Sequence, residues 1–102
     1  MKINYENNRI KKILEIDLLL QKNFPNEYKT IKNRLTMLNA VSNLSQISHL
    51  PPSRRHKLKG NLGECWAVDV SNKKRLIFKS LIEGLNPLKI TEIIIIGIED
   101  YH

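Results

Sequence analysis

Cysteine, long apolar runs and acidic residues are all scarce in this chain. A single cysteine, Cys65, among 102 residues allows no internal disulfide and no multi-cysteine metal site. No apolar run exceeds four residues, as in residues 93–96, whereas a membrane-spanning helix needs about 20. The N-terminal residues turn polar at once, so no secretory signal is expected. These absences predict a cytoplasmic protein that does not span a membrane.

Positive charge is what the chain has in excess. Its 17 Lys and Arg outnumber its 10 Asp and Glu, giving a net charge of +7 on a length that suits one domain, residues 1–102. Residues 53–79 hold eight of the basic residues and only two acidic ones. Such a chain favours a polyanionic partner, namely nucleic acid, an anionic membrane surface or an acidic protein. The two basic clusters in residues 53–79 favour a phosphate-binding surface over a merely solvated one.

The first part of the chain has the apolar spacing of two helices. Residues 7–22 are predicted to form the first, because apolar residues recur there at steps of three and four. Pro25 fits the first turn of a second helix that runs to about Val41 and has Arg34 on its polar face. The short connection between them predicts an antiparallel helix pair with both apolar stripes in the core.

After Pro51 and Pro52 the apolar period changes from helical to two. Residues 65–70 alternate, with Trp66, Val68 and Val70 on one face. Residues 75–80 alternate as well, which predicts that Arg75 and Lys79 lie on the face opposite Leu76 and Phe78. The basic side chains of this strand are therefore expected to point away from the helix-covered face.

Two further segments complete the predicted sheet. Residues 93–96 are four isoleucines, which predicts a strand buried on both faces. Residues 2–5 are a short candidate strand, and residues 60–63 are interpreted as a hairpin loop. The predicted fold class is α+β, with two N-terminal helices packed on a small, mainly antiparallel sheet of three or four strands.

Histidines and the lone cysteine are the candidate groups for proton transfer or nucleophilic attack. His56 lies in the densest basic cluster, where neighbouring cations favour the neutral imidazole that a general base needs; a surface histidine in a basic loop is the alternative. His49 is interpreted as structural or incidental, and Cys65 as a buried thiol. His102 directly follows the end of the most apolar strand, which is expected to tether it. No two histidines are three or four residues apart, so neither a metal nor another cofactor is expected.

Cations, histidines and a tyrosine suffice for one reaction on a polyanion, the cleavage of RNA. The 2′-OH attacks the adjacent phosphate, so the enzyme needs a base, a stabilised phosphorane and an acid for the leaving 5′-oxygen. Histidine suits either proton transfer, and Lys or Arg suits the phosphorane. Tyrosine or arginine can stack on a base and hold it in line.

A spaced set of residues resembles one known family. It consists of His56-Lys57-Leu58-Lys59-Gly60, a following strand with Trp66, Arg75 at the start of the next strand, and the closing Asp100-Tyr101-His102. With the two predicted helices and the Pro-Pro connector, this set resembles the HigB-type toxins of the RelE/ParE superfamily over nearly the whole chain. The resemblance implies a RelE-like fold and a type II toxin that cleaves ribosome-bound mRNA without metal. It also implies a helix-turn-helix antitoxin, the ribosome and mRNA as partners, and no membrane partner.

The resemblance assigns roles residue by residue. The residues it assigns to catalysis are His56, Lys59, Arg75, Asp100, Tyr101 and His102. Those that we assign to RNA binding are Arg54, Arg55, Lys57, Lys73, Lys74 and Lys79. Two positions depart from the family pattern, Ser53 where glycine is frequent and Lys74 where an aromatic or apolar residue is. Both departures are expected to alter loop geometry or substrate preference without removing a catalytic group.

Two other functions fit the same residues. A non-catalytic inhibitor on the same scaffold, such as a ParE-like DNA gyrase poison, shares the implied fold, and fold does not imply function. A plain RNA-binding protein needs only the net charge of +7. His56 and the closing triplet favour the nuclease.

Overall fold

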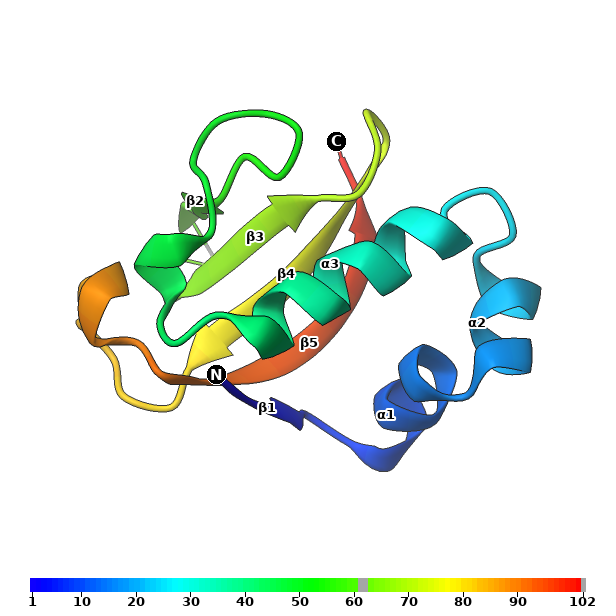
Figure 1. The fold of residues 1–102 in the computed structure, drawn as a ribbon, viewed down its shortest axis with the longest axis horizontal. Helices are drawn as coiled ribbons and strands as arrows, with labels where there is room; N and C mark the ends of the chain where they lie inside the picture. The colour runs from blue at the N-terminus through cyan, green and yellow to red at the C-terminus, as the bar shows by residue number, and fades with distance from the viewer. Residues whose placement is uncertain (61–62, 102) are drawn as a thin grey trace.

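The computed structural model describes residues 1–60 and 63–101, which form one sheet and its helical cover (Figure 1). The strands are β1 (Lys2–Tyr5), β2 (His56–Lys57), β3 (Cys65–Asp69), β4 (Lys74–Ser80) and β5 (Glu92–Asp100). The helices are α1 (Asn8–Glu15), α2 (Asp17–Asn23) and α3 (Tyr28–Ala40), with short 3-10 turns η1 (Leu44–Gln46) and η3 (Pro87–Lys89). The predicted α+β class is confirmed.

The sheet is a meander with one added strand. Strands β2 to β5 pair antiparallel with their neighbours in sequence, and β1 pairs parallel with β5, giving the order β1-β5-β4-β3-β2. The candidate strand at residues 2–5 is therefore confirmed as β1, and the described residues contain five strands where three or four were expected. β1 pairs with the first part of β5, residues 92–95, whereas β4 pairs with β5 as far as Asp100 and so holds the chain end in place.

The first predicted helix is wrong as a single element, because the chain divides it at Ile16. Ile16 has extended backbone angles between α1 and α2. Asp17 begins α2, where a negative charge favours the helix N-terminus, and its carboxylate accepts hydrogen bonds from Tyr28 and Lys32 of α3. These contacts hold the start of α2 against α3.

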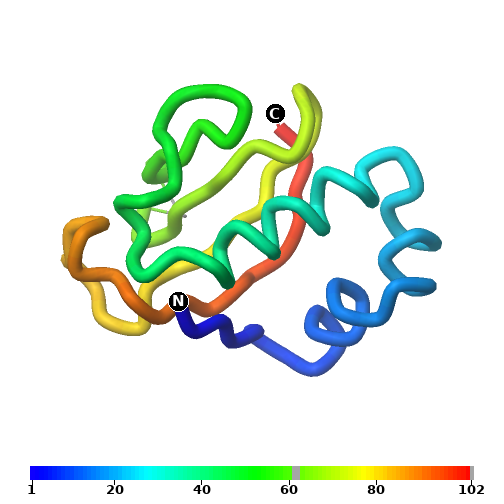
Figure 2. Tube along the Cα trace, in the orientation of Figure 1, coloured from blue at the N-terminus to red at the C-terminus, as the bar shows by residue number. Residues whose placement is uncertain are grey.

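The second predicted helix begins later than expected, and the antiparallel pair does not form. Pro25 lies in the turn before α3 rather than in its first turn. Helix α3 crosses one face of the sheet, whereas α1 and α2 lie together to one side of it, where α1 packs against β1 and β5 (Figure 2). Within the described residues, three helices thus replace the predicted two, and α3 is the helix that crosses the sheet.

The main core lies between α3 and one face of the sheet. Ile31 and Leu38 of α3 pack there, and the fully buried strand residues are Val68, Leu76, Phe78, Ile93 and Ile95. Ile94 and Ile96 on the same strand are only half-buried, so the prediction that β5 is buried on both faces holds for one face. No helix within the described residues is long and apolar enough to cross a membrane.

Candidate active site

The face of the sheet opposite α3 carries His56 and Arg75 of the predicted catalytic residues, and we call it the open face. A small cluster of Leu58, Cys65, Ala67 and Ile77 forms its floor, and within the described residues no apolar helical side chain packs against that cluster. Residues directly opposite each other in antiparallel strands share a face. His56 is opposite Ala67, so His56 lies on the open face.

Strand register adds a row of charged residues beside His56. Asp69 pairs with Arg75, and Arg75 pairs with Glu99, so all three share the open face. This row is two residues along β3 from the row of Ala67, which is about 7 Å along a strand. The predicted outward orientation of Arg75 is confirmed, because its neighbours Leu76 and Phe78 are fully buried on the side of α3.

Arg54, Asp69 and Tyr101 form a hydrogen-bonded group that we call the Asp69 cluster. Arg54 Nε lies 2.6 Å from Asp69 Oδ2, and Arg54 Nη2 lies 3.0 Å from Asp69 Oδ1. Arg54 Nη2 also donates to the Tyr101 hydroxyl at 2.6 Å, and that hydroxyl donates to Asp69 Oδ1. The cluster joins residues 32 and 47 positions apart in the sequence and orients the guanidinium and the phenol together.

Arg75 lies against the Asp69 cluster with a donor to spare. Its guanidinium carbon is 5.0 Å from the centroid of the Tyr101 ring, within the range of a cation–π contact. Its buried Nε has no hydrogen-bond partner among the described residues. A buried N–H without an acceptor is unfavourable, so the Arg75 guanidinium has unused donor capacity beside the Asp69 cluster.

His56 is held in one tautomer by the backbone of Arg54. His56 Nδ1 lies 2.7 Å from the Arg54 carbonyl oxygen. A carbonyl oxygen only accepts hydrogen bonds, so Nδ1 carries the proton and Nε2 of the neutral ring has a free lone pair. The imidazole therefore has the tautomer that a general base acting through Nε2 requires.

Arg54, whose carbonyl orients His56, itself has a strained backbone conformation. Its φ of 45° lies in the left-handed region, which costs a residue with a Cβ roughly 1–2 kcal/mol. Hydrogen bonds fix the turn on either side, from the Arg54 N–H to Leu50 O at 3.0 Å and from the Arg55 N–H to Ser48 O at 2.9 Å. Backbone strain of this kind is concentrated at functional sites.

Asp69 is the site residue that the sequence did not indicate. It is a lone acid in the alternating strand β3, and the only signal for it was its position on the face opposite Trp66 and Val68. Arg34, which was expected on the polar face of its helix, is instead buried and donates from Nε to the Asp69 carbonyl at 2.7 Å. Burial lowers the pKa of Arg34. This guanidinium anchors the end of β3 to α3.

The electrostatics of the cluster favour a charged Asp69. Burial by itself would raise the pKa of Asp69, but hydrogen bonds from Arg54 and Tyr101 and the charge of Arg54 outweigh it and lower that pKa. Burial and the hydrogen bond to Asp69 raise the pKa of Tyr101, so the phenol stays protonated. The guanidinium, the carboxylate and the phenol therefore keep complementary charge states at neutral pH.

The lowered pKa of Asp69 predicts a pH-dependent contribution to stability. A carboxyl whose folded pKa is below its ordinary 3.8 stabilises the fold above that value and loses the effect as pH falls through the folded pKa. We expect Asp69→Asn to lower the free energy of unfolding by about 1 kcal/mol at neutral pH, and by progressively less as pH falls below 3.8. Urea unfolding of both proteins at neutral pH and at a series of pH values below 3.8 measures this, and a difference that stays constant across the series would contradict it.

Asp100 and Tyr101, the first two residues of the predicted closing triplet, are both held by contacts with the segment that begins β4. Asp100 is the last residue of β5, and its Oδ1 lies 2.5 Å from Lys74 Nζ. The Tyr101 N–H donates to the Lys73 carbonyl at 2.8 Å. Asp100 thus contacts Lys74, and the ring of His56 takes its tautomer from Arg54. His102, the third member of the predicted triplet, lies outside the described residues.

The remaining basic residues divide between the two faces. Lys79 pairs with Cys65 and so lies on the open face, while Lys59 and Lys73 are exposed in loops. Arg55 donates to the Ile47 carbonyl at 2.9 Å and lies 5.6 Å from the Trp66 ring, which packs in the main core. Lys57 pairs with Trp66 and shares that side. Arg55 and Lys57 thus lie away from His56, although the sequence grouped them with it.

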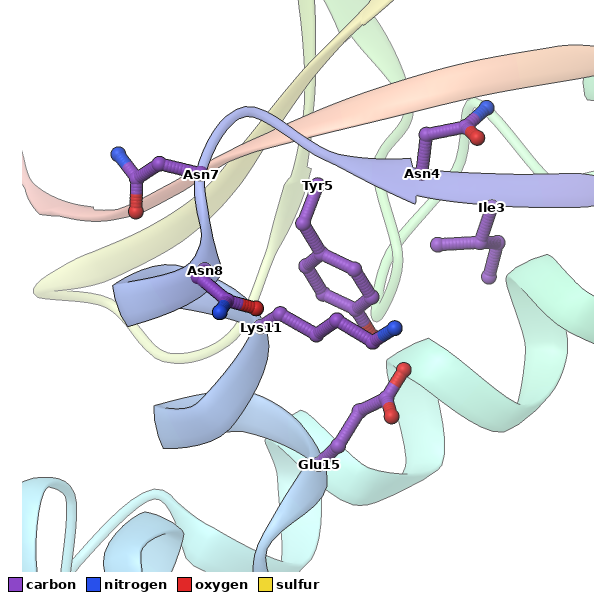
Figure 3. A pocket seen from close by; sticks show the side chains of 7 residues that line it. All are labelled: Ile3, Asn4, Tyr5, Asn7, Asn8, Lys11 and Glu15. Atoms are coloured by element: carbon purple, nitrogen blue, oxygen red, sulfur yellow. The ribbon is translucent and has the colours of Figure 1, made fainter.

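The hollow shown in Figure 3 is separate from the open face. It has a volume of about 370 Å³ between β1 and α1, and Asn4, Tyr5, Lys11 and Glu15 are among the residues around it. Burial and the nearby Glu15 carboxylate raise the pKa of Tyr5 to about 12. None of the predicted site residues lines this hollow. The described residues gather no three His, Cys, Asp or Glu side chains that could hold a metal.

Comparison with known proteins gives no match by sequence but does give matches by fold. No protein-family model matches the sequence, and the search of curated proteins gives no match. The solved structure of a YoeB/ParE toxin from Agrobacterium tumefaciens matches over 100% of both chains, with a TM-score of 0.60 at 12% sequence identity. The fold is RelE/YoeB-like. The RelE-like fold implied by the sequence resemblance is therefore confirmed.

A second solved structure has a similar fold, also at low sequence identity. The conserved hypothetical protein HP0894 from Helicobacter pylori matches with a TM-score of 0.53 and 17% identity, over 99% of this chain and 94% of its own. Likeness at such identities establishes the RelE/YoeB-like fold alone. The activity has to be argued from the residues on the open face.

Proposed function

We propose that this protein is a toxin of a type II toxin–antitoxin pair and a metal-independent endoribonuclease that cleaves ribosome-bound mRNA. The observation that carries the proposal is the open face of a RelE/YoeB-like fold, which brings together an imidazole with a bare Nε2, an arginine with a spare N–H and an oriented tyrosine. The HigB-like motif around His56 supports the same assignment.

The proposed reaction uses the ribose of the RNA as its nucleophile. His56 Nε2 takes the proton from the 2′-OH, whose oxygen attacks the adjacent phosphorus. Arg75 neutralises the charge that develops on the phosphorane, and the bond to the 5′-oxygen then breaks. The leaving oxygen takes a proton from an acid, for which we propose His102, the other histidine of the predicted catalytic set. The products carry a 2′,3′-cyclic phosphate and a 5′-OH.

Tyr101 and three lysines are proposed to hold the substrate. The Tyr101 ring offers a stacking platform for a base beside two guanidinium groups, and Lys79 and the exposed Lys59 and Lys73 offer charges for neighbouring phosphates. The proposed partners are the ribosome with its mRNA and a cognate helix-turn-helix antitoxin, in the cytoplasm.

The proposal is tested with purified protein, ribosomes and a defined mRNA. We expect cleavage only when ribosomes are present, with 2′,3′-cyclic phosphate or 3′-phosphate ends, and expect it to persist in a metal chelator that leaves the ribosomes intact. Intact mRNA in the presence of correctly folded protein would contradict the nuclease assignment.

The two alternatives give different results in parallel assays. A gyrase poison would block DNA supercoiling by gyrase and leave mRNA intact. A plain RNA-binding protein would bind RNA with an affinity that falls steeply as salt rises, without turnover. The tautomer of His56 favours the nuclease, because neither binding function needs a bare imidazole nitrogen on the open face.

A further inference from the structure

A continuous set of contacts links a carboxylate on β3 to the imidazole of His56. The Asp69 carboxylate accepts two hydrogen bonds from the Arg54 guanidinium, at 2.6 and 3.0 Å. The Arg54 carbonyl in turn accepts the hydrogen bond from His56 Nδ1 at 2.7 Å. Asp69 therefore touches the residue whose backbone orients the proposed base.

The contact matters because the Arg54 carbonyl points at His56 only while Arg54 keeps its left-handed backbone. At φ 45° a residue with a Cβ is strained and relaxes unless other contacts hold it. The side chain is held at its far end by Asp69, and the Asp69 N–H donates to the Ser53 carbonyl at 2.7 Å. One residue of β3 thus restrains both the backbone before Arg54 and its guanidinium.

We propose that Asp69 is a positioning residue, which holds Arg54 in its left-handed conformation so that the Arg54 carbonyl keeps His56 in the Nδ1–H tautomer. The inference rests on the proposed function only in taking His56 as the base. Asp69 itself touches neither the imidazole nor, in this proposal, the RNA. The carboxylate acts through Arg54.

The imidazole tautomer can be measured directly by ¹H–¹⁵N NMR of the full chain at a pH where His56 is neutral. We expect the wild type to show Nδ1–H for His56, whose signals are assigned by their absence in His56→Gln. Asp69→Ala is expected to give a mixture with a clear Nε2–H population. Asp69→Asn, which keeps the side-chain shape, is expected to shift the tautomer in the same direction to a smaller extent.

Asp17→Ala is the matched control. Asp17 is also a carboxylate that accepts hydrogen bonds from a tyrosine hydroxyl and a cation, Tyr28 and Lys32, but it lies in the helical layer. Its removal is expected to leave the His56 tautomer unchanged. An effect of Asp17→Ala equal to that of Asp69→Ala would mean that general loosening, and not positioning, moves the tautomer.

A double variant separates positioning from other effects of Asp69. Glycine adopts the left-handed region without strain, so Arg54→Gly should keep the turn without help from the carboxylate. We therefore expect Arg54→Gly combined with Asp69→Ala to restore the Nδ1–H tautomer that Asp69→Ala alone loses. A tautomer unaffected by Asp69→Ala and Asp69→Asn, or one not restored by glycine, would overturn the proposal.

Cleavage gives the corresponding kinetic result. Loss of the reactive tautomer is expected to lower kcat of Asp69→Asn roughly tenfold, with a much smaller change in KM. The NMR result does not depend on activity. If the wild type cuts no mRNA, the proposed function fails while the positioning by Asp69 is still decided by the tautomer.

Discussion

His56→Gln is expected to reduce cleavage of ribosome-bound mRNA about a thousandfold while the protein stays folded. General-base catalysis by a positioned side chain contributes about 10²–10⁴ in rate, and a glutamine amide has no comparable basic site. The amide can still donate a hydrogen bond to the Arg54 carbonyl that His56 now meets at 2.7 Å. The turn should therefore survive, and the melting temperature should change by only a few degrees.

His49→Gln is the matched control for this change. His49 is exposed and lies in the connector before Pro51, outside the proposed site. We expect its cleavage rate to equal that of the wild type. Single-turnover rates with saturating ribosomes compare the three proteins, and a His56→Gln enzyme that cuts within a few-fold of the wild-type rate would remove His56 from the chemistry.

Arg75→Ala is the second change with a large expected effect, a loss of about a hundredfold in cleavage rate. Removing one charged donor aimed at a developing oxyanion costs about 10²–10³ in kcat. Arg75 is half-buried on the open face, and its Nε has no partner among the described residues, so truncation breaks no side-chain hydrogen bond there. The free energy of unfolding is therefore expected to change by less than about 1 kcal/mol.

Arg75→Lys and Arg9→Ala complete this series. Lysine keeps the charge but lacks the planar fork, so an intermediate rate is expected. Arg9 is an exposed arginine of α1, and its loss lowers the net charge by the same amount without touching the open face. Equal losses in Arg75→Ala and Arg9→Ala would show that total charge, not the placement of Arg75, governs cleavage.

Faces and strand types followed from local pattern alone. A strand places successive side chains on opposite sides, so the alternation around Leu76 and Phe78 was enough to predict that Arg75 points away from the core. The α+β class followed from helical spacing before residue 42 and a period of two after residue 64. The RelE-like fold followed from the motif around His56 and the chain end.

Other features depend on contacts between distant residues. The break at Ile16 is marked by no proline or glycine in the sequence. The contacts of Asp17 with Tyr28 and Lys32 of α3 help to place it. Arg55 lies on the same side of the sheet as Trp66, because it donates a hydrogen bond to the Ile47 carbonyl and makes a cation–π contact with the Trp66 ring. Neither contact leaves a periodic signal in the sequence.

The sequence by itself supplied the groups that we propose for catalysis, and the tertiary structure decided which of them share the open face. His56, Arg75 and Tyr101 were recognisable from the spaced set that resembles the HigB-type toxins. Asp69 was not, because a single acid in an alternating strand gives no sign of what it pairs with. Its role arises from strand register and from the return of β5 beside β4, which bring Arg54 and Tyr101 to the same carboxylate.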